Sequence, residues 1–246
     1  MPLQCVILAG GLGTRMRPFT ESLPKALLPV KGVPFADWQL AQLARQGVER
    51  VVYSVGYLGW MLKEHVGDGS RFGLSVTWVD EGEELRGTGG ALRLALDRGA
   101  LDDAFFVLYG DSYLPVALRE VERASHRCHL PALMTVMRNE ERWDASNAIL
   151  ADGRVVLYDK SRPRNRLAEM RWIDYGLSML TSEVVATRIE PQTVSDLGQL
   201  YHDLSIEGSL AGFEVAERFY EIGTAGGLAD LEAYLSERAE IPPPRR

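Results

Sequence analysis

A glycine-rich loop directly after an apolar run is the most informative stretch of this sequence. The run Leu3–Ala9 has the composition of a strand that is buried on both faces of a parallel sheet. Where such a strand ends, three glycines follow: Gly10, Gly11 and Gly13. Glycines let backbone N–H groups approach an anion closely and adopt positive φ angles. The loop therefore predicts a phosphate-binding cradle, to which Arg15 and Lys25 would add positive charge.

Two familiar nucleotide-binding loops do not fit these residues. A dinucleotide-binding G-x-G-x-x-G motif requires glycine at position 16, where the chain has Met16. A P-loop requires Gly-Lys-Ser/Thr about five residues after its first glycine, and the chain has Arg17-Pro18-Phe19 there. An ordinary glycine-rich turn is the structural alternative, but such a turn needs neither Thr14-Arg15 nor Pro24-Lys25.

Composition limits the class of protein. With 246 residues, the chain is long enough for one α/β domain with an appended subdomain and a sizeable core. The formal net charge of −7 argues against nucleic-acid binding, so the basic residues near the first loop suit a small anionic ligand. Cys5 and Cys128 indicate no disulfide framework. No apolar run reaches membrane-spanning length and no signal peptide is indicated, so we expect a cytoplasmic protein without a membrane partner.

Alternating apolar runs and helical patterns predict an α/β fold with a mixed, mainly parallel sheet flanked by helices. We expect strands over Leu3–Ala9, Arg50–Val55, Leu74–Val79, Ala104–Tyr109, Ala132–Met137 and Arg171–Leu180. We expect helices over Pro34–Gly47, Trp60–Val66, Ala91–Arg98, Leu114–Ser125, Gln199–Ile206 and Ala225–Arg238. Asp152-Gly153, between two short apolar runs, predicts a β-hairpin that interrupts this alternation.

Two later stretches suit nucleotide and metal binding. The cluster Gly87-Thr88-Gly89-Gly90 precedes a predicted helix, whose first backbone groups can read the edge of a base. Asp111 follows a predicted interior strand, at the end where open α/β sheets place their ligands. Mg²⁺ commonly combines one or two carboxylates with substrate phosphates, so Asp111 is a candidate magnesium ligand. The structural alternatives are an ordinary glycine-rich turn and a turn-capping aspartate.

The first motifs resemble those of the sugar-1-phosphate nucleotidyltransferases, or NDP-sugar pyrophosphorylases. The resemblance is carried by Gly10-Gly11-Leu12-Gly13-Thr14-Arg15, Arg17-Pro18, Pro24-Lys25 and Leu28-Pro29-Val30. It implies a Rossmann-like fold of the nucleotide-diphospho-sugar transferase (GT-A-like) type, with a small antiparallel sugar-binding subdomain. It also implies one domain over 1–240, divided into a nucleotide-binding half (1–130), a sugar-phosphate-binding half (131–224) and a closing helix (225–240), before a flexible tail (241–246).

The resemblance also implies roles for individual residues. Arg15 and Lys25 would be catalytic, and Asp111 and Glu221 would bind Mg²⁺. Nucleotide contacts are expected from Leu8, Ala9, Gly10, Gly11, Gly13, Thr14, Glu81, Gly87, Thr88 and Gly89. Sugar-phosphate contacts are expected from Lys160, Asp174 and Gly176.

The chain departs from the family pattern at several of these positions. Asp159-Lys160-Ser161 stands where the family usually has Glu-Lys-Pro. Asp174-Tyr175-Gly176 stands in place of an Asn-Ala-Gly-like sequence. Glu221 replaces the usual aspartate and is one methylene longer, which matters because Mg²⁺ requires near-octahedral geometry.

By resemblance, we expect an enzyme that joins a nucleoside triphosphate to a sugar 1-phosphate, releases pyrophosphate and uses Mg²⁺ as its cofactor. Ser54-Val55-Gly56-Tyr57 and the second glycine cluster are most similar to bacterial heptose 1-phosphate guanylyltransferases. This favours GTP and D-glycero-D-manno-heptose 1-phosphate or a related manno-configured sugar. A homo-oligomer is compatible with the family.

Three alternatives stay open. The run from His65 to Gly73 is equally similar to N-acetylmuramate 1-phosphate uridylyltransferases. The departure at Glu221 fits a catalytically silent nucleotide-sugar-binding regulatory protein, although Arg15, Lys25 and Asp111 are intact. Transfer to an alcohol phosphate such as phosphocholine shares the first loop but fits the later motifs less well.

Overall fold

The computed structural model describes residues 3–11, 13–16, 18–82 and 84–238. The chain forms two compact units, each made of separate stretches. Unit 1 contains Met1–Leu85, Leu108–Tyr113 and Phe219–Arg246, and unit 2 contains Arg86–Val107 and Leu114–Arg218. The functional halves expected at 1–130 and 131–224 stay a prediction, and the expected tail at 241–246 lies outside the described residues.

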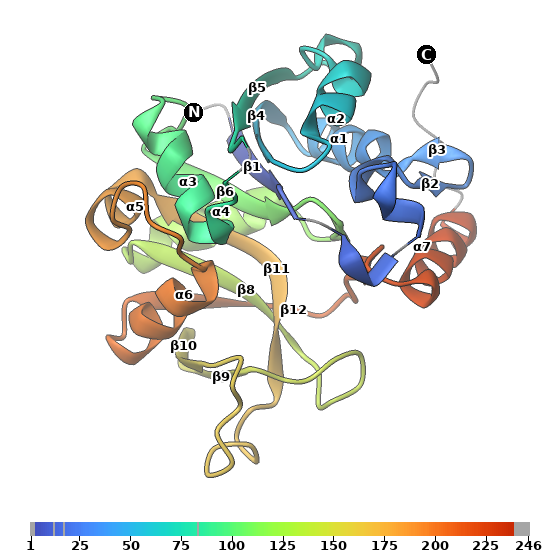
Figure 1. Ribbon diagram of the computed structural model, residues 1–246. Coiled ribbons are helices and arrows are strands. Elements are labelled where there is room, and N and C mark those ends of the chain that lie inside the picture. The colour runs from blue at the N-terminus through green and yellow to red at the C-terminus, as the bar shows by residue number, and fades with distance from the viewer. Residues whose placement is uncertain (1–2, 12, 17, 83, 239–246) are drawn as a thin grey trace. The chain divides into compact units, whose positions relative to one another are not determined.

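Unit 1 contains parallel strands in the order β5-β4-β1 (Figure 1). They are β1 (Leu3–Ala9), β4 (Val48–Val55) and β5 (Ser75–Asp80). β1 is buried over nearly its whole length, as expected for an apolar run inside a parallel sheet. The end of β6 (Ala104–Tyr109) also belongs to unit 1, where Gly110 N donates to Leu8 O at 2.9 Å.

The described α-helices of unit 1 are α1 (Phe35–Arg45), α2 (Gly59–Val66) and α7 (Ala225–Glu237). α1 packs on β4, and Phe35 and Trp38 of α1 share one apolar cluster with Leu231 and Leu235 of α7. The cluster also includes side chains from the hairpin β2 (Pro29–Val30) and β3 (Val33–Pro34). The core of unit 1 is therefore completed by a helix from the far end of the chain.

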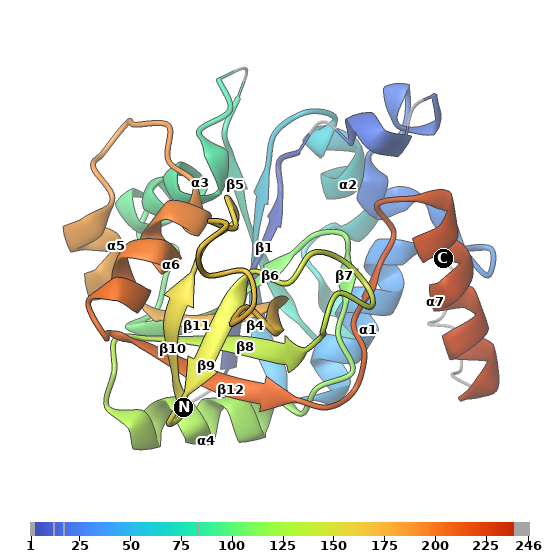
Figure 2. The same ribbon diagram turned by 90° about the horizontal axis from the view of Figure 1, so that it is seen from below.

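Unit 2 contains a mixed group of strands in the order β11-β8-β12-β10-β9 (Figure 2). They are β8 (Ala132–Arg138), β9 (Ala148–Ala151), β10 (Arg154–Tyr158), β11 (Trp172–Thr181) and β12 (Leu210–Val215). β8 and β12 are parallel, and the other neighbouring pairs are antiparallel. β9 and β10 form the hairpin predicted around Asp152-Gly153.

The described α-helices of unit 2 are α3 (Gly87–Asp97), α4 (Leu118–Cys128), α5 (Ser182–Arg188) and α6 (Leu197–Ile206). α4 packs against β8, β11 and β12, whereas α6 packs against β10 and β12. α3 contacts both α5 and α6. In the described part of the chain, no helix of either unit has the length and apolar character needed to cross a membrane.

The α/β class predicted from the sequence is confirmed, and the structure corrects two helix starts. The helix expected from Leu114 begins at Leu118. Pro115 disfavours a helical conformation at Leu114, and Ala117, the residue before the helix, still has an extended backbone. The helix expected from Ala91 begins at Gly87, so the second glycine cluster forms its first turn. α5 (Ser182–Arg188), which begins after the N-cap Thr181, was not predicted.

Replacing Gly110 with alanine tests the close approach of β6 to β1. An added Cβ would lie 2.8 Å from Ala9 Cβ and 3.0 Å from Leu8 O, so the backbone must shift. We expect Gly110→Ala to lower the free energy of unfolding by about 1–3 kcal/mol, measured by urea denaturation. In the control Gly226→Ala, at the start of α7, the nearest atom is Thr224 Oγ1 at 4.0 Å, and helix propensity favours alanine. Equal stability of Gly110→Ala and wild type would contradict this contact.

Candidate functional site

The first glycine loop continues directly from the buried strand β1, whose last residues are Leu8 and Ala9. Gly13 has φ +62°, a left-handed conformation that favours glycine. Its carbonyl accepts hydrogen bonds from Thr20 Oγ1 at 2.8 Å and Met16 N at 2.9 Å. Thr20, which the sequence analysis missed, therefore holds the bend of the loop. Leu12, Arg17 and the Arg15 side chain lie outside the described part of the chain.

Two glycines of this loop differ in their surroundings. A Cβ on Gly10 would lie 2.5 Å from Glu81 Oε1, so the absence of a side chain lets that carboxylate approach the loop. Glu81 is 9% exposed, and its N–H donates to Val55 O at the end of β4. Gly11 is exposed, and a Cβ there would meet no described atom within 4 Å. Thr14 is also exposed and begins the 3₁₀ turn Thr14–Met16.

The turn that carries Asp111 is held against β1 and α1. Gly110 lies too close to Ala9 for any side chain, and Asp111 follows it. The buried Gln39 of α1 donates through Nε2 to Tyr109 O at 3.0 Å and to Ser112 O at 2.9 Å, bridging the two sides of the turn. Gln39 was not predicted as a site residue, although a polar residue on a helix face rich in apolar side chains is a signal that could have revealed it.

Lys25 and Asp111 form an ion pair, with 2.8 Å between Lys25 Nζ and Asp111 Oδ2. The side chains are 17% and 22% exposed, so both are largely shielded but still reachable by solvent. Lys25 begins a 3₁₀ turn after Pro24, 86 positions from Asp111 along the chain. The fold of unit 1 thus brings together a predicted catalytic lysine and a predicted metal ligand.

Glu221 lies on a short strand beside the Asp111 turn. β13 (Tyr220–Glu221) pairs antiparallel with β7 (Ser112–Tyr113), which places Glu221 opposite Ser112. Ile222 N donates to Asp111 O at 3.0 Å. The described residues include no group of three or more His, Cys, Asp or Glu side chains suited to a metal ion. The backbone segments that carry Asp111 and Glu221 are adjacent, and Mg²⁺ commonly combines one or two carboxylates with substrate phosphates and water. The metal-binding role of both residues stays a prediction.

The second glycine cluster lies in unit 2 and packs against the segment that precedes α6. Gly87 has φ +69°, and a Cβ there would lie 2.5 Å from Ser195 O. Gly89 N donates to the same carbonyl at 2.8 Å, and Thr88 Oγ1 accepts from Leu197 N at 2.8 Å. Ser195 was not predicted from the sequence. These contacts show a packing requirement for the glycines, while the nucleotide-binding role stays a prediction.

Three predicted sugar-side residues lie near one another in unit 2. Asp174 of β11 accepts hydrogen bonds from Gly176 N at 2.9 Å and Tyr158 OH at 3.5 Å. Gly176 has φ +95°, again suited to glycine. Lys160, in the turn after β10, is 57% exposed, and its Nζ lies 3.7 Å from Asp196 Oδ1.

Burial changes the pKa values of two residues in this part of unit 2. Burial raises the pKa of Asp174 above its ordinary value, while the hydrogen bond from Gly176 and the positive charge of Lys160 act in the opposite direction. Burial also raises the pKa of Tyr158, which is further raised by the negative charge of Asp174. Tyr158 therefore stays a neutral hydrogen-bond donor to Asp174 at physiological pH.

Comparison with known proteins identifies relatives of the chain. Residues 5–188 match the MobA-like NTP transferase domain. The chain is 31% identical over 158 residues to a D-glycero-alpha-D-manno-heptose 1-phosphate guanylyltransferase of Aneurinibacillus thermoaerophilus, covering 63% of this chain and 66% of that protein. It is 36% identical over 94 residues to an N-acetylmuramate alpha-1-phosphate uridylyltransferase of Neisseria meningitidis, covering 38% of this chain and 41% of that protein. These matches thus span less than two thirds of either relative's length.

The fold has counterparts among solved structures. The crystal structure of HddC from Yersinia pseudotuberculosis complexed with GMP-PN superimposes with a TM-score of 0.78 at 22% sequence identity. The match covers 95% of this chain and 99% of that one, which confirms the expected nucleotide-diphospho-sugar transferase fold. The resemblance inferred from the first loop is also confirmed. The chain therefore belongs to the MobA-like NTP transferase family, among the sugar-1-phosphate nucleotidyltransferases.

Proposed function

We propose that the chain transfers a nucleoside monophosphate from a nucleoside triphosphate to a sugar 1-phosphate and releases pyrophosphate. The observation that carries this proposal is the ion pair between Lys25 and Asp111, at the carboxyl end of the strands from which the first glycine loop also emerges. Open α/β sheets bind their ligands at this edge. Membership of the family supports the same reaction class.

The reaction needs positioning and charge neutralisation more than covalent help. An oxygen of the sugar phosphate attacks the α-phosphorus in line with the departing pyrophosphate. Because this oxygen is already anionic, the protein needs neither a nucleophile nor a strong base. Lys25 and Arg15 bind the phosphate oxygens on which negative charge increases. Asp111 and Glu221 are the residues that would hold Mg²⁺, which supplies Lewis-acid chemistry to the phosphates when bound.

The remaining predicted residues divide between the two substrates. N–H groups of the first glycine loop, with Leu8, Ala9, Thr14 and Glu81 around it, bind the nucleotide, and Gly87, Thr88 and Gly89 contribute to base and ribose binding. Lys160 holds the incoming sugar phosphate, because a lysine ammonium binds phosphate as a mobile point charge. Asp174 and Gly176 contact the sugar, with the Asp174 carboxylate accepting its hydroxyl groups.

For the substrates, we propose GTP and a manno-configured heptose 1-phosphate. The support is the name of the Aneurinibacillus relative and the GMP-PN bound to HddC, together with the similarity of the second glycine cluster. The Neisseria relative favours a second candidate, UTP with N-acetylmuramate 1-phosphate. Both candidates use the same chemistry at the α-phosphorus, so substrate measurements decide between them.

A substrate matrix tests the proposed function. Each common nucleoside triphosphate is combined with each of several sugar 1-phosphates, and pyrophosphate release is measured with Mg²⁺ and with a chelator. We expect Mg²⁺-dependent release to be fastest with GTP and the manno-configured heptose 1-phosphate. Faster release with UTP and N-acetylmuramate 1-phosphate would select the second candidate. Tight nucleotide-sugar binding without release from any pair would instead indicate the silent regulatory protein.

Removing either partner of the Lys25–Asp111 ion pair should mainly slow the chemical step. We expect Lys25→Ala and Asp111→Asn each to reduce kcat on the order of 100-fold or more, comparable to the loss of one preorganised electrostatic group. Rates are measured at saturating substrates, with circular dichroism as a check of folding. Lys63→Ala, an exposed lysine of α2, is the control and should keep the wild-type rate. Near-normal turnover of either site variant would rule out its assignment.

Asp174→Asn should raise the thermal stability of the protein and weaken binding of the sugar 1-phosphate. The raised pKa means that the folded state binds the Asp174 proton more tightly than the unfolded chain, so stability falls as pH rises above the ordinary aspartate range. We expect the variant to have a higher Tm than wild type at pH 7. This difference should shrink in acid, where wild-type Asp174 is protonated. The KM for the sugar 1-phosphate should rise, because one acceptor oxygen is replaced by a donor.

These effects of Asp174→Asn are followed by thermal unfolding across pH and by steady-state kinetics. Asp152→Asn, in the exposed turn between β9 and β10, is the matched control and should leave both quantities unchanged. A lower Tm for Asp174→Asn at pH 7 would show that burial of the charged carboxylate is not the main effect of Asp174 on folding stability.

A further inference from the structure

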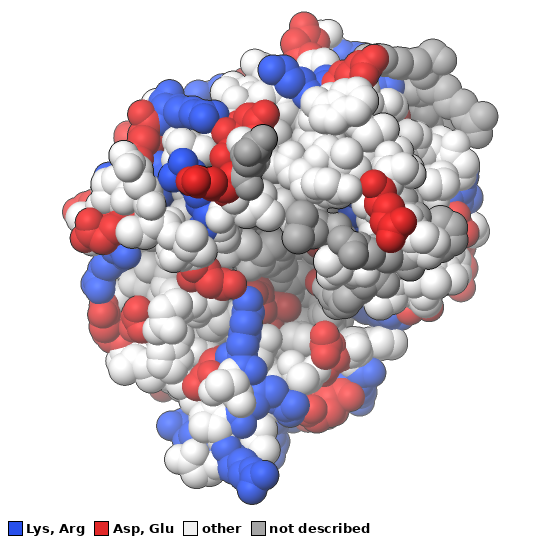
Figure 3. Space-filling model, viewed as in Figure 1, with Lys and Arg blue, Asp and Glu red and all other residues white. Residues whose placement is uncertain are grey.

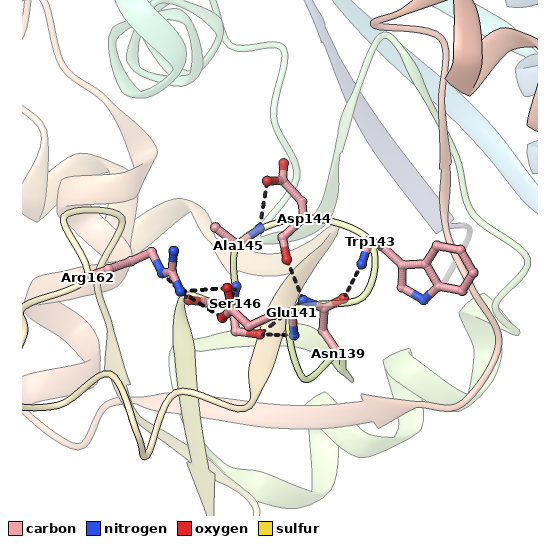
Figure 4. A network of polar contacts seen from close by, with 7 residues as sticks. All are labelled: Asn139, Glu141, Trp143, Asp144, Ala145, Ser146 and Arg162. Carbon is pink, nitrogen blue, oxygen red and sulfur yellow. Dashed lines mark hydrogen bonds and ion pairs between the residues drawn. The ribbon is translucent and has the colours of Figure 1, made fainter.

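A loop that played no part in the sequence analysis is ordered by buried polar side chains. It runs through residues 139–147, between β8 and β9, and we call it the β8–β9 loop. Asn139 is fully buried and donates to Asp144 O at 2.6 Å and to Ser146 Oγ at 3.0 Å (Figure 4). Its Oδ1 accepts from Trp143 N at 3.0 Å. One amide side chain thus bonds to three positions of the loop and fixes its path.

Arg162, from the segment between β10 and β11, is bonded to this loop at two points. Its Nη2 lies 2.7 Å from each carboxylate oxygen of Glu141, and its Nε donates to Ser146 O at 2.9 Å (Figure 4). Glu141 Oε1 also accepts from Ser146 N at 3.1 Å. The ion pair is therefore one part of a larger network, which gives it a geometric role that an isolated surface pair lacks.

Both members of this ion pair adopt an unusual backbone conformation. Glu141 has φ +63° and Arg162 has φ +52°, in the left-handed region that is costly for residues other than glycine. Such conformations persist where surrounding contacts hold them, and functional sites are enriched in them. The network around Arg162 provides these contacts at both positions.

The turn between these contacts carries Lys160. Asp159 N donates to Asn147 O at 2.9 Å, so the β8–β9 loop holds the start of the turn. Arg162 N donates to Asp159 O at 3.3 Å, and the Arg162 side chain attaches the end of the turn to the same loop. Asn147 also accepts from Asp174 N through Oδ1 at 3.0 Å. One loop therefore bonds to the backbone both at Asp159, next to Lys160, and at Asp174.

The neighbouring Arg166 side chain has a different partner. Arg166 lies in the same segment but pairs locally with Glu169, three positions away, at 2.6 Å. On the face shown in Figure 3, basic and acidic side chains are interspersed around the lower end of the view, where Figure 1 draws the segment between β10 and β11. If positive charge alone matters for sugar-phosphate binding, removing Arg166 should have the same effect as removing Arg162. If the geometry of the Lys160 turn matters, only the removal of Arg162 should have an effect.

We propose that Arg162 and Glu141 are positioning residues for Lys160, and that their network sets the affinity for the sugar phosphate. The Lys160 side chain is 57% exposed, and its Nζ lies 3.7 Å from Asp196 Oδ1, which is a long distance for an ion pair. Because that contact is weak, the location of its ammonium group depends on the backbone turn from which the side chain extends. This inference rests on the proposed function, since it takes Lys160 as the ligand of the sugar phosphate.

The kinetic test compares Arg162→Ala with Arg166→Ala. Arg162→Ala should raise the KM for the sugar 1-phosphate on the order of 10-fold, as when a residue that orients a ligand-binding group is lost. The KM for the nucleoside triphosphate should stay within about twofold of wild type, because Arg162 bonds to Glu141, Ser146 and Asp159, and none of these is proposed to bind the nucleotide. Glu141→Gln should give a smaller rise, since its amide oxygen can still accept hydrogen bonds. Arg166→Ala should leave both KM values unchanged.

A second measurement reports on the turn without any substrate. Amide hydrogen exchange of the peptide that contains residues 159–162 should be faster in Arg162→Ala than in wild type and unchanged in Arg166→Ala. Arg162→Lys should restore part of the protection, because it keeps the charge next to Glu141 but cannot reproduce the fork of donors. Circular dichroism confirms that the variants fold.

The two readouts separate the possible failures. Unchanged exchange in Arg162→Ala, or faster exchange with an unchanged KM for the sugar 1-phosphate, would overturn the positioning role. An equal rise in both KM values would also overturn it, since that indicates a general structural effect. If wild-type protein turns over no sugar 1-phosphate, the proposed function fails, and the exchange comparison then decides by itself whether Arg162 holds the turn.

Discussion

The close approach of the ends of β1 and β6 is the constraint on which the arrangement of the predicted site residues in unit 1 depends. Gly110 donates to Leu8 O and leaves no room for a side chain against Ala9. Asp111 consequently emerges next to the strand from which the first glycine loop extends. Gln39 fixes the turn from the side of α1. Lys25, at the start of a 3₁₀ turn, pairs with Asp111 at 2.8 Å.

The second carboxylate reaches the same turn by a different route. Glu221 comes from the C-terminal part of the chain, and its position depends on the pairing of β13 with β7. Ile222 next to it is fully buried in the cluster that joins α1 and α7. Packing of α7 onto the N-terminal core therefore sets the register that brings Glu221 opposite Ser112.

In unit 2, polar contacts rather than apolar packing connect the elements that carry the predicted site residues. Lys160 and Asp174 lie on different elements, and both are tied to residues of the β8–β9 loop. Part of this arrangement lowers stability, since burial raises the pKa of Asp174 and so disfavours its charged form. A carboxylate held in such a place is a stronger acceptor for a sugar hydroxyl than one in water. With the proposed role of Asp174 in sugar binding, stability and substrate binding oppose each other at this residue.

Local patterns in the sequence were enough to predict β6, its end at Tyr109, and the loop and carboxylate that follow β1 and β6, because apolar runs and glycines act over a few residues. They determined the α/β class and the family. Only the tertiary structure decided the roles of Gln39, Ser195 and Arg162, whose partners lie far away or on another element. The same holds for the pairing of Lys25 with Asp111 across 86 positions. Such contacts form when packing brings distant backbone segments together. A local pattern of residue types does not show which distant residue will lie beside it.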